Sequence, residues 1–109
     1  MRIAIRSRNH VSTELRHSLE RRLRFVLGRF AGRVSRVSVH LAELNKSYGK
    51  TTKRCKIVVQ LVRSARVCIE DTDADFQKAA DRATGRVGQA VERALARRHS
   101  AGAHAALMV

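Results

Sequence analysis

Alternating apolar and polar residues predict four β-strands along this chain. Residues 2–6 alternate, with Ile3 and Ile5 on one face, which is typical of a strand with one buried side. The same period of two recurs over residues 36–42, 55–62 and 67–69. Residues 45–54 are polar and basic and contain a glycine, so we expect a loop there between the second and third strands.

Two other segments repeat their apolar residues with the period of an α-helix. The first follows Ser12, a favourable N-cap residue, and is expected to end near Gly32. Its apolar residues are Leu15, Leu19, Leu23, Val26, Leu27 and Phe30. The second is expected over residues 75–98, after an acidic segment (residues 70–75) whose carboxylates suit a helix N-terminus better than a metal site. Its apolar residues are Phe76, Ala80, Ala83, Val87, Val91 and Ala94.

The order of elements is therefore β-α-β-β-β-α, which indicates an α+β fold. We expect one four-stranded sheet with both helices packed on one face and the other face open to solvent. Residues 1–98 are expected to form this domain. Residues 99–109 continue no periodicity and are expected to be a disordered tail.

The expected open face of the sheet contains no aromatic side chain. Its outward positions are Arg2, Ala4, Arg6, Arg36, Ser38, His40, Ala42, Lys56, Val58 and Gln60. Small RNA-binding domains often stack bases on aromatic residues of such a face. Base stacking on the sheet is therefore not expected, and the helices become the expected binding surface.

Composition adds a strong positive charge to this picture. The 109 residues include 23 Lys and Arg against nine Asp and Glu, a formal net charge of +14, and 18 of the basic residues are arginine. Such an excess favours a polyanionic partner, and the planar guanidinium group suits phosphate oxygens. A surface charged only for solubility, or a basic surface that binds a membrane, is the alternative. A surface charged only for solubility would not need its charges sorted onto one face.

No pattern along the chain is typical of an enzyme, a metal site or a membrane protein. There is no P-loop, no nucleophile with a placed base and no separated pair of carboxylates. Cys55 and Cys68 are expected to be reduced thiols on strands, and the five histidines are scattered, so we expect no metal and no cofactor. No apolar stretch approaches the roughly 20 residues that cross a bilayer, and the N-terminus is unlike a signal peptide. We therefore expect a cytoplasmic binding protein that is not an enzyme.

The basic residues of the second helix fall on one face. At about 100° per residue, six positions lie within an arc of about 100° and along about 29 Å of helix. We call this set the basic stripe, and its members are Lys78, Arg82, Arg86, Gln89, Arg93 and Arg97. Asp81 and Glu92 fall on the opposite flank, so no acid of the same helix interrupts the stripe and its cations repel one another. Such segregation indicates a surface that binds RNA phosphates.

Two arginines of the first helix complete the candidate RNA-binding surface. Arg22, Arg29 and Arg33 fall on one flank of that helix's apolar face, and Arg22 and Arg29 are the two expected site residues. If the helices pack side by side, this row and the basic stripe are expected to border a shared groove.

The sequence resembles the ribosome hibernation promoting factor family, which includes the ribosome-associated inhibitor called protein Y. The similarity covers residues 1 to about 98. It is carried by the opening MRIAIRSRN, by residues 11–30, 34–45 and 55–61, and by DTDADFQKAADRATGRVGQAVERAL at residues 71–95. The last segment leads from the spacing DxDxxxxxAxD into the basic helix.

The resemblance implies a fold like that of double-stranded RNA-binding domains. It also implies binding to small-subunit rRNA at the decoding channel, which would block access of mRNA and tRNA. The rRNA-facing basic residues of the family match Arg82, Arg86, Arg93 and Arg97, whereas Lys78 enters from the helix geometry alone.

The family comparison also implies how the protein is organised. It implies a short form that is monomeric away from the ribosome, with no small-molecule substrate and without the C-terminal domain through which long members pair ribosomes. The family often has Tyr, Ile and Arg where this chain has Gln77, Ala80 and Gln89.

Two other functions stay open at this point. One is a general binder of structured RNA that has no role at the ribosome, which plain duplex RNA competing with equal affinity would favour. The other is a protein-interaction module that modulates a sigma factor, which the uneven charge disfavours.

Overall fold

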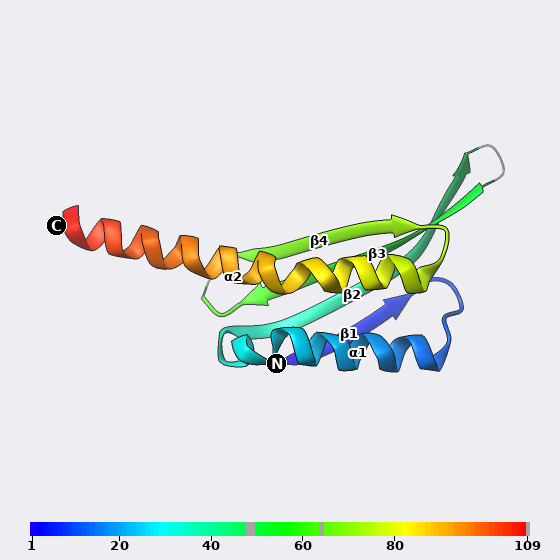
Figure 1. Ribbon diagram of the computed structural model, residues 1–109, viewed down its shortest axis with the longest axis horizontal. Coiled ribbons are helices and arrows are strands. Elements are labelled where there is room, and N and C mark those ends of the chain that lie inside the picture. The colour runs from blue at the N-terminus through cyan, green and yellow to red at the C-terminus, as the bar shows by residue number, and fades with distance from the viewer. Residues whose placement is uncertain (48–49, 64, 109) are drawn as a thin grey trace.

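Four strands lie side by side in the order in which the sequence supplies them. The computed structural model describes the backbone of residues 1–47, 50–63 and 65–108, and the side chains of residues 1–44, 51–63 and 65–97. The strands are β1 (Arg2–Ser7), β2 (Val34–Ser47), β3 (Lys50–Leu61) and β4 (Arg66–Asp73), and they form one sheet in the order β1-β2-β3-β4. The helices are α1 (Thr13–Leu27), the 3₁₀-helix η1 (Gly28–Arg33) and α2 (Phe76–Met108). Both long helices cover the same face of the sheet (Figure 1), so the predicted α+β fold and element order are confirmed.

Strand direction follows from the connections between the strands. Because α1 crosses over between β1 and β2, those two strands run parallel, whereas β2, β3 and β4 are antiparallel neighbours. The register places Val39 between Ile5 and Ile57, and Ile57 opposite Ile69. Apolar side chains therefore form continuous rows across the helix-covered face.

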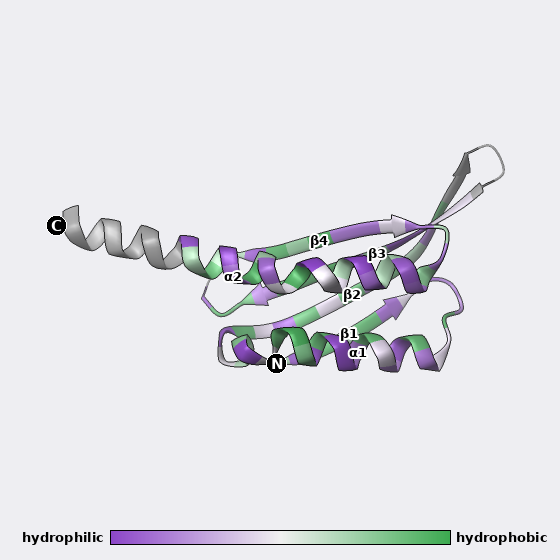
Figure 2. Cartoon of the chain, viewed as in Figure 1, coloured by the Kyte–Doolittle hydropathy of each residue, from purple (hydrophilic) through white to green (hydrophobic). Residues whose placement is uncertain are grey.

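The core lies between this face and the two helices. Leu23 and Leu27 of α1 and Val87 and Val91 of α2 are fully buried. They pack against strand residues with no exposed surface, which include Val37, Val39, Ile57 and Val59. Burial of one such side chain contributes roughly 1.5–3 kcal/mol. Along α1 and the described part of α2, hydrophobic and hydrophilic residues alternate in colour within each turn (Figure 2).

The predicted loop over residues 45–54 is wrong for most of that segment. β2 continues to Ser47 and β3 begins at Lys50, with Ser47 paired to Lys50 and Leu44 paired to Thr52. This hairpin projects beyond the other two strands (Figure 1). A strand ladder is held by main-chain hydrogen bonds to its partner, so a polar segment joins it when a partner strand lies alongside. Residues 48–49 lie outside the described residues.

Both predicted helix ends also differ from the structure. α1 ends at Leu27, and the residues up to Arg33 continue as the 3₁₀-helix η1. The end expected near residue 98 is too early, because α2 runs to Met108. Its last ten residues are rich in Ala, Leu and Met, which are strong helix formers, and include no proline. The side chains of residues 98–109 lie outside the described residues, and the expected disorder of residues 99–109 stays an untested prediction.

Two glycines inside α2 differ in what surrounds them. Gly88 faces α1, where a Cβ atom would lie 3.5 Å from the carbonyl oxygen of Val26. At Gly85 a Cβ atom would meet nothing within 4 Å. Glycine therefore weakens the helix at residue 85 without serving a close contact there.

Replacing Gly85 by alanine is expected to stabilise the protein. The gain should approach about 1 kcal/mol, because alanine loses less backbone entropy in a helix, and should raise the Tm by about 4 °C or more. Thermal unfolding followed by circular dichroism measures it. The matched reverse substitution, Ala96→Gly at an exposed position of the same helix, should lower the Tm, and an unchanged or lower Tm for Gly85→Ala would contradict the expectation.

Candidate nucleic-acid interface

The first turn of α2 and its buried side chains determine which side of the helix faces the core. Asp75 Oδ1 accepts a hydrogen bond from the backbone N–H of Gln77 at 2.9 Å, which caps the helix as the acidic segment predicted. Ala83 and Val87 then point into the core. With these residues inward, the basic stripe lies on the flank of α2 that faces β4, away from α1.

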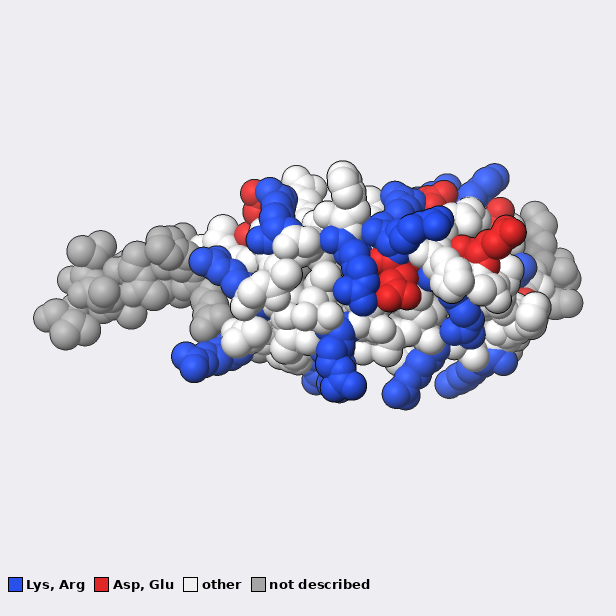
Figure 3. Space-filling model, turned by 90° about the horizontal axis from the view of Figure 1, so that it is seen from below, with Lys and Arg blue, Asp and Glu red and all other residues white. Residues whose placement is uncertain are grey.

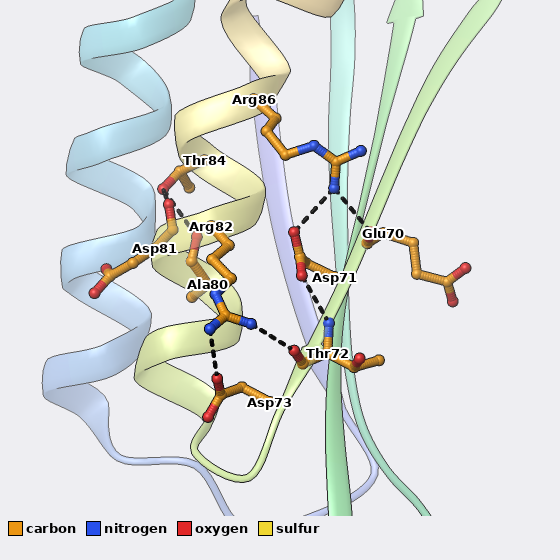
Figure 4. A network of polar contacts seen from close by, with 9 residues as sticks. All are labelled: Glu70, Asp71, Thr72, Asp73, Ala80, Asp81, Arg82, Thr84 and Arg86. Carbon is orange, nitrogen blue, oxygen red and sulfur yellow. Dashed lines mark hydrogen bonds and ion pairs between the residues drawn. The ribbon is translucent and has the colours of Figure 1, made fainter.

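Two arginines of the stripe form ion pairs with carboxylates of β4. Arg82 lies 3.3 Å from Asp73, and Arg86 lies 2.9 Å from Asp71 (Figure 4). Each guanidinium also donates a hydrogen bond to a main-chain carbonyl of β4. The sequence expectation that no acid interrupts the stripe is therefore correct within the helix and wrong in the folded chain. The acids come from the neighbouring strand, which helical spacing does not reveal.

These ion pairs leave the arginines accessible. The side chains of Arg82 and Arg86 are 59% and 57% exposed, whereas those of Asp73 and Asp71 are 16% and 18% exposed. The carboxylates thus lie beneath the guanidinium groups and hold them in place over β4. An approaching phosphate would meet the guanidinium groups before the carboxylates.

The C-terminal half of the stripe borders a hollow between α2 and β4. The hollow has a volume of about 650 Å³, and its cationic residues are Arg93, Arg97 and Arg66. Arg66 is an exposed residue of the edge strand β4, and the sequence analysis did not include it among the site residues. Its outward position in the strand alternation was the available signal. Among the described residues, Lys78, Arg93 and Arg97 take part in no ion pair, and Gln89 is exposed on the same flank.

Arg22 and Arg29 do not share a groove with the stripe, contrary to the sequence expectation. Arg22 forms an ion pair with Asp81, and Arg29 forms one with Glu92 at 3.2 Å. Both acids lie on the flank of α2 that faces α1, so α2 itself separates the two basic rows. The space-filling view from the α1 side shows basic and acidic side chains next to one another there (Figure 3). These arginines link the two helices, with each exposed pair contributing roughly 0–1 kcal/mol.

Removing the two β4 carboxylates is expected to strengthen RNA binding. The double substitution Asp71→Asn and Asp73→Asn releases Arg86 and Arg82 while keeping the side-chain oxygens that accept backbone N–H groups. Each of the two exposed ion pairs contributes up to about 1 kcal/mol, so the affinity should rise by up to about 30-fold. Binding titrations with labelled RNA measure the change.

A matched control separates this effect from net charge. Glu14→Gln with Glu43→Gln adds the same charge at exposed positions that form no ion pair within the described part of the chain. If the control variant gains as much affinity as the Asp71 and Asp73 variant, the ion pairs do not restrain the stripe.

The two cysteines differ in burial and in acidity. Both are free; Cys55 is buried on β3, and Cys68 is exposed on β4. Burial, together with the negative charge of Asp71, raises the pKa of the Cys55 thiol to about 12. At neutral pH this thiol is therefore protonated and shielded, so it acts as a small apolar core residue.

One thiol per molecule is expected to react with Ellman's reagent in the folded protein at pH 8. That thiol is Cys68, and Cys55 should react only after denaturant is added. Because the unfolded thiol ionises near its ordinary pKa of 9.0, stability should fall as the pH rises from about 9 toward about 12. Two fast-reacting thiols in the native state would contradict the burial of Cys55.

Comparison with known proteins finds similarity to solved structures. No protein-family model and no curated protein sequence matches this chain. Among solved structures, the N-terminal domain of Thermus thermophilus Protein Y aligns with a TM-score of 0.63 and 26% identity, covering 84% of this chain and 93% of that one. The resemblance to the protein Y family is confirmed. A ribosomal subunit interface protein from Coxiella burnetii shares the fold, with a TM-score of 0.71 and 18% identity over 88% of this chain and 99% of that one.

Proposed function

We propose that this protein binds the rRNA of the small ribosomal subunit and inhibits translation by occupying the decoding channel. The observation that carries the proposal is the exposed basic stripe along α2, on a fold shared with Protein Y and with a ribosomal subunit interface protein. An occupied channel would exclude mRNA and the anticodon ends of tRNA. Such a protein is a hibernation factor, which stops translation by occupying the ribosome and catalyses no reaction.

The proposed contacts are mainly electrostatic. Arg82 and Arg86 would bind rRNA phosphates either in place of their β4 carboxylates or together with them, because a guanidinium group can donate to two acceptors at once. Arg93, Arg97 and Arg66 would receive a second phosphate at the hollow between α2 and β4. Phosphate contacts set the position of the protein, and the shape of the folded RNA supplies selectivity.

The proposal includes the setting in which the protein works. We place it in the cytoplasm, as a non-enzymatic protein that is monomeric away from the ribosome and needs no cofactor or small-molecule substrate. Within the described part of the chain, no helix has the length and apolar character needed to cross a membrane.

Sedimentation through a sucrose gradient tests this function. The purified chain should travel with isolated small subunits and should prevent them from binding initiator tRNA. Large subunits provide the matched control and should carry little of the protein. Failure to co-sediment with small subunits, or normal binding of initiator tRNA at saturation, would contradict the proposal.

A general binder of structured RNA is the second candidate. It is favoured by the outward positions of the described strands, which include no aromatic residue that could read bases. Duplex RNA of about 16 base pairs, the length that a double-stranded RNA-binding domain spans, serves as a competitor in the same gradient. Release of the protein at equal concentrations of duplex and subunit would favour this second function.

A further inference from the structure

The face of the sheet opposite the helices carries its own set of cations. Side chains alternate between the two faces of each strand, and the residues next to the buried ones point outward. Each of the four strands contributes at least one basic residue to this open face, and the set comprises Arg2, Arg6, Arg36, Arg54, Lys56 and Arg66.

The strand register brings basic residues next to one another. Arg2 pairs with Arg36 across β1 and β2, and His40 lies between Arg6 and Lys56 in a second row. Two residues along a strand are separated by about 6.6 Å, so these two rows lie about 13 Å apart. Like charges directly opposite each other destabilise a sheet. Within these two rows the described acid is Glu70 of β4, which lies opposite Lys56.

Acidic residues are concentrated on the other side of the molecule. Five ion pairs lie on the helix side, where they join Asp71, Asp73, Asp81, Glu92 and Glu20 to arginines. On the open face, the described residues form one ion pair, between Arg54 and Glu70 at 3.2 Å. Figure 3 shows Lys and Arg side chains protruding along its lower rim, where the sheet lies, while acidic side chains lie mainly in the upper half.

The open face is also hollowed where the cations meet. His40 and Lys56 line two adjacent hollows of about 360 and 220 Å³. Arg6 and Arg54 border the larger hollow, and Arg36 and Arg66 border the smaller one. Phosphate groups placed in these hollows would therefore be contacted from several strands.

We propose that the open face of the sheet is a second RNA-binding surface. It binds the sugar-phosphate backbone of a different RNA strand from the one that the basic stripe contacts. Arginine favours phosphate because its fork donates two parallel hydrogen bonds. Ala4 and Val58 are the main apolar side chains on this face, so it offers little apolar surface for insertion into a membrane. The outward positions of the described strands include no aromatic residue, so the contact is sequence-independent.

The site lies outside the surface on which the proposed function rests. The basic stripe is on the helix layer, and the sheet separates it from the outward residues of β1–β3. Arg66 borders both the smaller hollow of the open face and the hollow beside α2. We therefore leave Arg66 unchanged in the test, because its loss would affect both surfaces.

The test uses a protein whose basic stripe has been neutralised, so that the remaining binding reports the open face. The background is the full chain with Arg82→Gln, Arg86→Gln and Arg93→Gln. The probe is a fluorescent 12-nucleotide oligouridylate, titrated at several salt concentrations. Adding Arg6→Gln, Arg36→Gln and Lys56→Gln should weaken binding at least tenfold, and should reduce the salt dependence of log Kd by about 2, from three lost contacts at about 0.7 each.

A charge-matched variant provides the control. Adding Arg21→Gln, Arg33→Gln and Arg63→Gln to the same background removes three exposed cations elsewhere. The binding affinity should stay within about threefold of that of the background, because distant exposed charges are screened and have a weak effect. Circular dichroism checks that both variants are folded. Equal losses in the two variants would overturn the proposal. Tight binding of polyglutamate of equal charge to the open face would assign it to an acidic polypeptide and would also overturn the proposal.

The outcome is independent of the ribosome experiment. If oligouridylate binding does not depend on Arg6, Arg36 and Lys56 while initiator tRNA is still blocked, this inference fails and the proposed function stands. If oligouridylate binding depends on them but small subunits do not bind the protein, the proposed function fails and the second surface stands.

Discussion

Replacing Arg82, Arg86 and Arg93 together by glutamate is expected to weaken binding to the small ribosomal subunit by at least about 100-fold. Each arginine contributes on the order of 1 kcal/mol or more through a charge-assisted contact to phosphate. Three such losses of about 1 kcal/mol correspond to a factor of about 150. The introduced carboxylates would in addition repel the RNA.

The structure shows which control this variant needs. Glutamates at positions 82 and 86 would lie near Asp73 and Asp71, so repulsion between α2 and β4 could lower stability as well. The glutamine variant of the same three residues removes the cations without adding charge, and circular dichroism checks both for folding. Arg21→Glu, Arg33→Glu and Arg63→Glu give an equal charge change away from the stripe. If the folded glutamate variant still co-sediments with small subunits, the stripe does not bind them.

Binding to small subunits is expected to weaken by about 250-fold when the salt concentration rises from 50 to 200 mM. The five cations of the basic stripe would neutralise about five phosphates, and each releases 0.7–0.9 of a counterion, so the slope of log K against log salt is about −4. A fourfold change in salt then gives a factor of about 4 to the fourth power. Equilibrium binding at several KCl concentrations measures this slope.

The glutamine variant of the stripe provides the matched comparison for the salt series. With three of five contacts removed, its slope should be smaller in magnitude by about 2. A wild-type slope near zero would mean that apolar packing or base stacking dominates. That result would be incompatible with recognition of phosphates by the α2 arginines.

The periodicity of apolar residues was sufficient to predict the fold. The buried residues Leu19 and Leu23 of α1, and Val87 and Val91 of α2, follow the helical spacing, because a helix on a sheet must bury one side. The projecting part of the β2–β3 hairpin could not be predicted in the same way. Its residues bury no apolar row, and its strands exist through main-chain pairing with each other, which no local pattern records.

The candidate site was predictable in its helical positions but not in its surroundings. Helical spacing correctly grouped Arg82 and Arg86 on one flank of α2. Their carboxylate partners, Asp71 and Asp73, belong to a strand that the helix meets only after folding. The same limit applies to Arg22, whose partner Asp81 lies 59 residues further along the chain.

The charge of the open face illustrates a different limit. Its outward positions follow from the alternation of residues along each strand, but that alternation does not show which of their charges lie together. Arg2 and Arg36, or Arg6 and His40, become neighbours only through the strand register. The distribution of acids onto the helix side is likewise visible only once the ion pairs are known.

The order of strands in the sheet has a consequence for synthesis of the protein. Each strand pairs with its neighbour in sequence, so β1, β2, β3 and β4 can assemble one after another as the chain leaves the ribosome. Until α2 emerges, however, the apolar side of β3 and β4 has no cover, since α2 is the helix that packs against both. The segment that closes the core therefore also carries the basic stripe. A nascent chain therefore acquires its stable core and its α2 arginines in the same step, so copies that lack α2 cannot bind RNA through this helix.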